Sequence, residues 1–368
     1  MASSRWLQVL STGLEPDALT RMGDAVTSPR AFILPEGKRF AFTVMDDTDV
    51  ATVENVAPVY ALLERLGMRA TKTVWTMACP EGSRNFAGSQ TLEDPDYQAF
   101  VVGLRQRGFE VASHGATMES SRRERTVAGL ERFRAVLGAY PRVHANHALN
   151  RDNLYWGPAR IDQPLLKRLL ERRRDTAAFY YQGHLRQSPY WWGDLCVRHI
   201  QYVRNLTFND INVLRVNPSM PYRDPSRPLV AWWFSASDAE DAAAFCRLIS
   251  PARQERLERE GGACIVATHF GKGFAKDGRV ANEVRERLEM LAGRPGWFPT
   301  VGELLDWLRA RRQEDVLPRR EWRRMQWVWA RDLVLRKGWE AWHRQVAARW
   351  KRRHDPEAGA SLATGCTP

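Results

Sequence analysis

The sequence predicts an α/β fold in which parallel strands are joined by helices. Two observations support this: short apolar segments alternate with segments of helical periodicity, and polar residues recur where the apolar segments end. Such alternation gives either a barrel or a doubly wound sheet. Both architectures place functional residues at the C-terminal ends of the strands.

The first predicted strand covers residues 39–50, RFAFTVMDDTDV, which are apolar up to a polar end. Residues 51–67 follow with apolar side chains at helical spacing and Gly67 as a stop signal. Further strands are predicted at 70–75, 109–115, 142–150, 229–238, 263–274 and at the start of 297–312. Further helices are predicted at 94–108, 120–138, 239–249, 251–260, 282–293 and in the rest of 297–312.

Residues 151–228 interrupt the alternation, because they are rich in aromatic residues, Asn and Pro. We expect them to form a long elaboration beside the site. The chain then divides into an N-terminal extension (1–37), a main α/β unit that contains this elaboration (38–312), and a basic, Trp-rich helical tail (313–368).

Composition narrows the class of protein. The 368 residues are 44% hydrophobic and 27% charged, as in soluble globular proteins. No apolar run approaches the roughly 20 residues of a transmembrane helix, and residues 1–20 lack the pattern of a secretory signal. The five cysteines are scattered without a C-x-x-C pair, so we expect a cytoplasmic protein without a zinc ribbon or a disulfide framework.

The formal net charge of +12 is concentrated near the C-terminus, where residues 319–353 hold twelve Lys or Arg and three acids. Apolar residues recur there at mostly three- and four-residue steps: Trp322, Met325, Trp329, Trp339, Trp342, Val346 and Trp350. The pattern predicts a basic amphipathic helix that either lies on an anionic membrane or packs its apolar stripe on the protein. No nucleic-acid-binding module accompanies it, so nucleic acid is not an expected partner.

Five short motifs carry a family resemblance: FTVMDD, GFEVASHG, GAYPRVHANHALN, CIVATH and GWFPTVGELLDWL. In this order they resemble the motifs of NodB-type polysaccharide deacetylases, carbohydrate esterase family four. The resemblance covers about residues 38–310, except most of 151–228. The stretches DDTD, WWGDLC and NLTFNDIN also resemble a WbmS-like branch found in O-antigen and capsule gene clusters.

The resemblance implies a distorted (β/α) barrel that removes an N-acetyl group from a sugar with the help of a divalent metal, zinc being the expected one. It places Asp46 at the catalytic base, Asp47 and His114 at metal ligands, and His269 at the group that protonates the departing amine. Asp46 and Asp47 are adjacent on an extended chain, so their side chains point to opposite sides. Without the resemblance, both would be interpreted as a solvated acidic strand end or as caps of the following helix.

Two positions depart from the family pattern. Met118 stands where the second metal-binding histidine is expected, and its neutral thioether is poorly suited to zinc. Ala145 stands where an arginine normally orients the base. His147 is the preferred replacement ligand, with His144 or Asp49 as alternatives. The equal alternative is that His144 and His147 hydrogen-bond substrate or loop backbone instead.

Other polar and aromatic residues are candidates for binding the sugar. Trp191 and Trp192 could stack on a sugar ring, with Asp194 and Asn146 beside them. Asp238 could pair with a site histidine or cap the next helix.

Three functions therefore compete. The favoured one is a metal-dependent sugar deacetylase of surface-polysaccharide biosynthesis, acting in the cytoplasm on a nucleotide- or lipid-linked precursor, with the tail near the membrane. The second is an inactive deacetylase-like protein that binds carbohydrate or assists assembly. The third is a metal-free glycoside hydrolase, which needs a second carboxylate such as Asp194 or Asp238.

Overall fold

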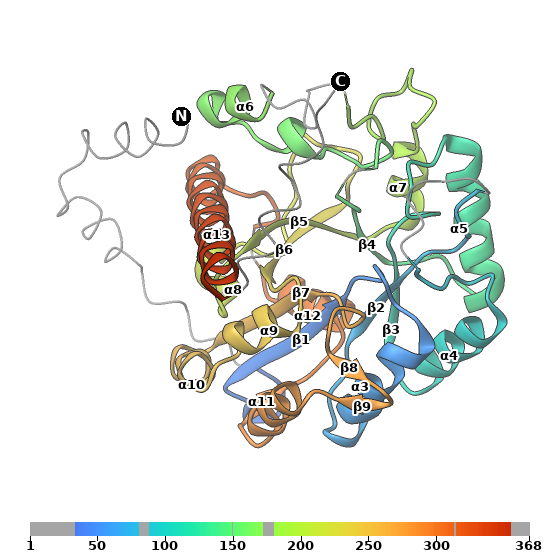
Figure 1. The fold of residues 1–368 in the computed structure, drawn as a ribbon. Helices are drawn as coiled ribbons and strands as arrows, with labels where there is room; N and C mark the ends of the chain where they lie inside the picture. The colour runs from blue at the N-terminus through green and yellow to red at the C-terminus, as the bar shows by residue number, and fades with distance from the viewer. Residues whose placement is uncertain (1–33, 81–87, 149, 172–179, 313, 355–368) are drawn as a thin grey trace, which may run out of the picture.

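The computed structural model describes residues 34–80, 88–148, 150–171, 180–312 and 314–354, and within the last helix its side-chain description ends at Arg336. Seven parallel strands form a closed barrel because β1 pairs with both β2 and β7 (Figure 1). The strands are β1 (Phe40–Asp46), β2 (Thr71–Val74), β3 (Glu110–Ser113), β4 (Val143–Ala145), β5 (Tyr202–Phe208), β6 (Trp232–Asp238) and β7 (Gly262–Thr268). The predicted (β/α) barrel is confirmed.

The barrel is distorted at one edge of β1. The short strand β10 (Gly296–Trp297) pairs with the beginning of β1, where Phe40 lies opposite Gly296. Strand β2 pairs only with its end, where Met45 lies opposite Thr71. One side of β1 is therefore shared by two strands, instead of pairing along its whole length with one neighbour.

Helices surround the barrel, and their ends follow local sequence signals. Thr52 and Asn55 form a capping box at the start of one helix, as Thr300 and Glu303 do at another. The helices between and after the barrel strands are α3 (Val53–Arg65), α4 (Pro95–Gln106), α5 (Arg123–Leu137), α9 (Ala242–Leu248), α10 (Pro251–Glu260), α11 (Asn282–Ala292) and α12 (Val301–Arg309). A small hairpin, β8 (Ala275–Lys276) and β9 (Arg279–Val280), follows β7.

Side chains alternate across the barrel wall. On β1, Phe40, Phe42 and Val44 join the cluster formed with the outer helices, whereas Ala41 and Met45 join the barrel interior. The same alternation holds on β6 and β7, whereas β5 has a register shift between Arg204 and Thr207. Outside this irregularity, parity along a strand decides which residues face the barrel axis.

The prediction that residues 151–228 form only an elaboration is wrong for residues 202–208. These residues form β5, a central strand that pairs with β4 and β6. The rest of the segment supplies η2 (Gly157–Arg160), α6 (Pro164–Glu171), α7 (Gly193–His199) and the four-residue helix α8 (Val213–Val216). The alternating YVRNLTF pattern indicated a strand, but the surrounding Asn- and Pro-rich sequence hid it.

The C-terminal helix α13 (Arg319–His354) belongs partly to the barrel. Its first half lies on the outer side of β5 and β6, where the chain between these strands provides only α8 (Figure 1). Trp322, Met325 and Trp329 are buried there against outward-facing residues of both strands. For this half of α13, the apolar stripe packs on the protein, which is one of the two alternatives predicted from the sequence. Trp339, Trp342 and Trp350 lie outside the described side chains. No helix in the described part of the chain is long and apolar enough to cross a membrane.

Candidate active site

Polar side chains converge at the C-terminal end of the barrel. Asp47, His114, His147, Arg204 and His269 each follow the parity that turns a residue toward the barrel axis. They come from β5 or from the chain just after β1, β3, β4 and β7, so their sequence separations are large. This convergence is what parallel strands with aligned C-terminal ends produce.

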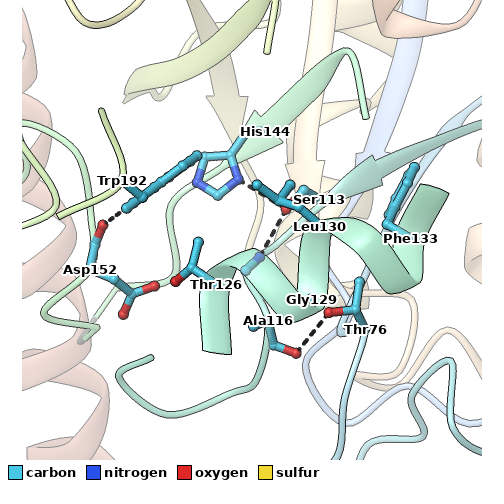
Figure 2. Close-up of a pocket in the computed structure, with 11 residues that line it drawn as sticks. Thr76, Ser113, Ala116, Thr126, Gly129, Leu130, Phe133, His144, Asp152 and Trp192 are labelled. Carbon is cyan, nitrogen blue, oxygen red and sulfur yellow. Dashed lines mark hydrogen bonds between the residues drawn. The ribbon is translucent and has the colours of Figure 1, made fainter. Parts of the chain in front are cut away.

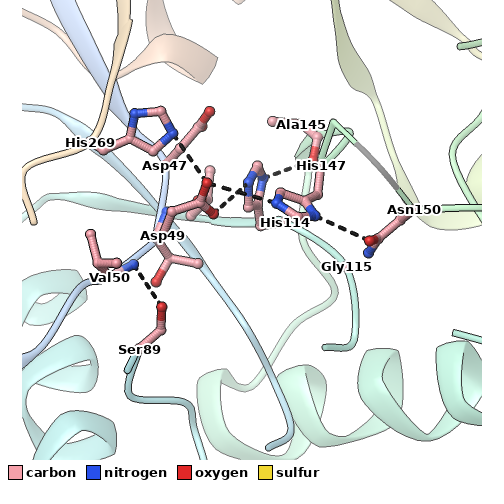
Figure 3. A network of polar contacts seen from close by, with 12 residues as sticks. Asp47, Asp49, Val50, Ser89, His114, Gly115, Ala145, His147, Asn150 and His269 are labelled. Carbon is pink, nitrogen blue, oxygen red and sulfur yellow. Dashed lines mark hydrogen bonds and ion pairs between the residues drawn. The ribbon is translucent and has the colours of Figure 1, made fainter. Parts of the chain in front are cut away.

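Asp49 lies at the centre of three histidines (Figure 3). The Nε2 atoms of His114, His147 and His269 lie 3.5, 3.8 and 3.3 Å from its carboxylate oxygens. Burial alone would raise the pKa of Asp49, but the histidines outweigh this and hold it far below its usual value. The same carboxylate raises the pKa of His269 against the effect of burial, whereas burial lowers that of His147.

A strained turn directs Asp49 into the site. The next residue, Val50, has φ 54°, a conformation that a β-branched residue rarely adopts. Ser89 Oγ accepts from the Val50 N–H at 2.7 Å, and Asn55 Nδ2 donates to the Val50 carbonyl at 2.8 Å. A Cβ on Gly271 would lie only 2.6 Å from that carbonyl, so the turn is packed tightly from behind.

The other ring nitrogen of each histidine is anchored to an oxygen. His114 Nδ1 bonds the Ala145 carbonyl at 2.9 Å, His269 Nδ1 bonds the Glu240 carbonyl at 2.7 Å, and His147 Nδ1 lies 3.1 Å from Asn150 Oδ1. These oxygens accept, so Nδ1 carries the proton in each ring. In the neutral form each Nε2 then points a lone pair at Asp49. In metal-binding histidines, the ring nitrogen that does not bind the metal usually donates to a carbonyl or carboxylate oxygen.

The donor set fits a divalent cation. Oδ1 of Asp49 is buried and has no hydrogen-bond partner. When a nitrogen lone pair faces a carboxylate and no proton lies between them, the two electron-rich groups repel each other, and a cation bound between them removes this repulsion. Imidazole nitrogens together with a carboxylate are ligands that suit zinc. Within the described residues, no three His, Cys, Asp or Glu side chains already stand at the spacing of a metal site. Binding therefore requires these side chains to close in.

Arg204 is a site residue that sequence reasoning missed. From β5, its two terminal nitrogens bind the two carboxylate oxygens of Asp47 at 2.9 and 2.5 Å. Burial opposes ionisation of Asp47, but Arg204 outweighs it and lowers the pKa. Both side chains are almost fully buried. The motif resemblance places an arginine on the preceding strand, where Ala145 stands, and no motif pointed to Arg204.

Asp46 lies on the other side of the barrel wall. Its carboxylate forms an ion pair with Lys72 of β2 at 2.9 Å, and both side chains are 0% exposed. Tyr60 of α3 donates to it at 3.0 Å, and the backbone N–H of Phe270 donates at 2.8 Å. Burial by itself would lower the pKa of Lys72, but Asp46 outweighs this and raises it. Asp46 therefore does not join the histidines at the barrel mouth.

Trp75, which follows β2, is a further member of the site that sequence reasoning missed. It is buried, and its ring centroid lies 4.6 Å from that of His114 and 5.2 Å from that of His147. The two histidine rings are 5.5 Å apart. Trp75 thus restricts both rings from one side. The only signal was its position at a predicted strand end. Met118 lies in the irregular segment after β3 and is half-buried.

The predicted sugar-binding residues are dispersed. His144 and Asn146 face outward from β4, and Trp192 donates to the Asp152 carbonyl. Asp194 pairs with Arg123 at the surface, and Arg123 also donates to the carbonyl of Trp191. Asp238 alone stays near the mouth, where it pairs with Arg336 of α13 and interacts electrostatically with Arg204 and His269.

A small cavity lies outside the barrel wall, between β3, β4 and α5 (Figure 2). Its volume of about 20 Å³ is enough for roughly one water molecule. His144 and Asp152 both line it. Burial lowers the pKa of His144 to about 3 and raises that of Asp152 to about 7. The cavity therefore favours the neutral form of both groups.

Replacing Asp152 with Asn is expected to stabilise the protein above pH 7. The unfolded chain releases this proton near pH 4 and the folded chain near pH 7, so wild-type stability falls between these values and is flat above them. Asn can still accept from the Ser121 N–H, which lies 2.9 Å from Asp152 Oδ1. Urea unfolding at pH 8 should show a gain on the order of 2–4 kcal/mol. The gain should shrink toward pH 5; an equal gain at both pH values would contradict the assignment.

Comparison with known proteins gives only structural likenesses. No protein-family model matches the chain, and no curated protein matches it. Among solved structures, the allantoinase Puue is similar, with 12% identity, a TM-score of 0.47 and coverage of 81% of this chain and 98% of that one. A family 4 acetyl xylan esterase from Clostridium thermocellum in complex with a cobalt ion has 12% identity, a TM-score of 0.37 and coverage of 76% and 99%.

The chitin deacetylase from the fungal pathogen Colletotrichum lindemuthianum is also similar, with 14% identity, a TM-score of 0.34 and coverage of 73% and 88%. Likenesses at this level carry no argument about activity, and the resemblance to an O-antigen branch stays a prediction. The strand pairing itself establishes the architecture. The chain is thus a distorted (β/α) barrel, and solved structures that resemble it include family 4 esterases and deacetylases.

Proposed function

We propose that this protein is a metal-dependent hydrolase that removes the N-acetyl group from a sugar. One observation carries the proposal: three histidines, each anchored through Nδ1, turn Nε2 toward Asp49 beside the paired Asp47 and Arg204. A cation site next to a buried, oriented carboxylate is the equipment that amide hydrolysis needs.

The cation would be held by Asp49, His114 and His147, with zinc the expected metal for this set of nitrogen and oxygen donors. When bound, a divalent cation lowers the pKa of a water and polarises the acetyl carbonyl. The proposal therefore assigns two metal-ligand roles to other residues than the family motifs do. Asp49 takes the ligand role assigned to Asp47, and His147 replaces the histidine lost at Met118.

Asp47 would then take the role of base that was assigned to Asp46. Arg204 lowers the pKa of Asp47, so this carboxylate is ionised and able to accept a proton from the attacking water. The two-point contact with Arg204 also fixes the plane of the carboxylate. Asp46 is unsuited to this role because its charge is already neutralised by Lys72 outside the barrel.

His269 would protonate the departing amine. Its Nδ1 is tied to the Glu240 carbonyl, which leaves Nε2 to carry the transferable proton, and Asp49 raises its pKa. Water oxygen bonds to the acetyl carbon, the carbon–nitrogen bond breaks, and the proton released by water reaches Asp47. The products are acetate and the free amino sugar.

We propose a nucleotide- or lipid-linked N-acetyl sugar as the substrate, used in the cytoplasm for assembly of an O-antigen or capsule. The motifs FTVMDD, GFEVASHG and CIVATH and the stretches DDTD and NLTFNDIN support this substrate class through family resemblance. The metal-free glycoside hydrolase finds less support, because both candidate second carboxylates are paired with arginines, Asp194 with Arg123 and Asp238 with Arg336.

A matched pair of histidine variants tests the proposal. His147→Ala is expected to lower bound zinc from about one ion per chain to near zero and to abolish acetate release from UDP-N-acetylglucosamine or N-acetylglucosamine oligomers. His144→Ala, three residues away but outward-facing, should keep both. Metal content is measured by mass spectrometry of purified protein, and folding by circular dichroism. A wild-type protein with neither metal nor acetate release would favour the inactive carbohydrate-binding alternative.

A further inference from the structure

We propose that the outer face of α13 docks on the surface of an anionic lipid bilayer. The outer face is defined here by Arg320, Arg323, Trp327, Arg331, Val334 and Leu335. The inference goes beyond the proposed function, because it concerns a surface outside the barrel and no step of hydrolysis depends on it.

Large apolar side chains on this face are exposed. Trp327 is 48% exposed, Val334 59% and Leu335 60%. They lie within nine residues of one helix, and Val334 and Leu335 follow Trp327 by seven and eight residues, which is about two turns, so they share one side. Elsewhere in the described residues, exposed large hydrophobic side chains are spread singly over different elements, as at Leu165 and Val197. A grouped apolar surface on a soluble domain marks an interaction site more often than scattered residues do.

The charged residues that define the outer face are all basic. Arg320 and Arg323 are exposed, and among the residues that the structure describes, neither has a carboxylate within ion-pair distance. The first half of the helix holds two acids: Glu321 accepts from Ser219, and Asp332 accepts from the Asn209 N–H and pairs with Arg331 of the outer face at 3.0 Å. The face therefore presents positive charge around an apolar centre, which complements anionic headgroups above an acyl layer.

The packing of α13 keeps this face outward. Trp322, Met325 and Trp329 on the opposite side are buried against β5 and β6, so the helix does not rotate to hide Trp327. The sequence from 337 to 353 continues with six Lys or Arg and one acid, Glu340. A tryptophan beside arginines suits the headgroup region of a bilayer, where its ring is apolar and its N–H remains hydrated.

Vesicle flotation of the full chain tests the proposal. We expect wild-type protein to float with vesicles of phosphatidylcholine and phosphatidylglycerol (3:1) at 150 mM salt, and to stay behind with pure phosphatidylcholine. Trp327→Ser with Leu335→Ser, and separately Arg320→Ser with Arg323→Ser and Arg331→Ser, should each lower the floated fraction about tenfold. Leu165→Ser with Val197→Ser is the apolar control. Arg105→Ser with Arg198→Ser and Arg259→Ser is the charge control, because it changes net charge equally at distant exposed sites.

The controls should float like wild type. The proposal is overturned if wild type does not float, if the outer-face variants float as well as wild type, or if the charge control loses as much binding as the outer-face arginine variant. A wild-type dimer that the Trp327 and Leu335 changes dissociate, without any flotation, would assign the face to a second copy of the chain instead. Flotation needs no catalysis, so an inactive enzyme that floats leaves this inference standing and rejects only the proposed function.

Discussion

Replacing Asp47 with Asn is expected to lower kcat for acetate release by about 10²–10⁴-fold and to leave bound zinc in place. The variant keeps the shape of the side chain and loses its capacity to accept the proton of the attacking water. Arg204 binds both carboxylate oxygens of Asp47, so this residue is already oriented before substrate arrives. Steady-state kinetics with metal content measured on the same samples checks the expectation.

Asp49→Asn is the informative comparison, because it should lose metal and activity together. Arg204→Met should lower kcat more than it changes KM, since it releases the orientation of Asp47 without removing the carboxylate. Loss of metal from Asp47→Asn would return Asp47 to the ligand role that the motif resemblance gave it. Unchanged kcat in a folded, metal-loaded Asp47→Asn protein would remove Asp47 from the mechanism.

Replacing Lys72 with Met is expected to destabilise the fold by about 3–5 kcal/mol without touching the site. The change leaves the Asp46 carboxylate buried in the layer between the barrel and α3, with Tyr60 and the Phe270 N–H as its remaining partners. Removing one partner of a buried ion pair lowers the stability of the fold by more than the intact pair contributes, because the remaining buried charge is neither paired nor hydrated. Urea unfolding of the metal-free proteins measures the effect.

A double variant and a surface control decide the cause of the expected loss of stability. Lys72→Met combined with Asp46→Asn removes both charges and should recover a large part of the lost stability. Lys272→Met removes a partly exposed lysine that pairs with Glu240 and should cost less than about 1 kcal/mol. If the double variant is as unstable as Lys72→Met alone, the loss comes from the lysine side chain's packing and not from the stranded carboxylate.

Much of the candidate site was accessible from the sequence. His114, His147 and His269 were predicted as site residues, and the structure places them around one carboxylate. The reason is general: each follows an apolar strand, and parallel strands joined by helices bring their C-terminal ends together. Asp49 was named only as an alternative ligand, because a residue in a turn has no strand parity to fix its direction. The φ of Val50 supplies that direction.

Arg204 and Trp75 show what pattern reasoning misses. Arg204 lies on a strand hidden in an Asn- and aromatic-rich stretch, and its partner Asp47 is 157 residues away. Nothing local in either segment encodes that pairing. Trp75 contacts the rings of His114 in a tilted and of His147 in an edge-on arrangement, and an aromatic residue at a strand end predicts burial without naming what it packs against.

The C-terminal helix also has features that its sequence predicted and features that only packing decided. Its three- and four-residue apolar spacing determined a helix and an apolar stripe. Packing decided that Trp322, Met325 and Trp329 are core residues and that Trp327 is not, because the connection between β5 and β6 provides only the four-residue helix α8 and leaves a surface for the stripe to cover.

By itself, the sequence determined the alternation of strands and helices, the polar strand ends and the histidines that gather there, since these depend on periodicity and on parallel topology. Only the tertiary structure decided which of the adjacent residues Asp46 and Asp47 enters the barrel. One residue of register moves a side chain to the opposite face of a strand. The chain-distant partners Arg204 and Lys72 then stabilise Asp47 at the mouth and Asp46 outside the wall.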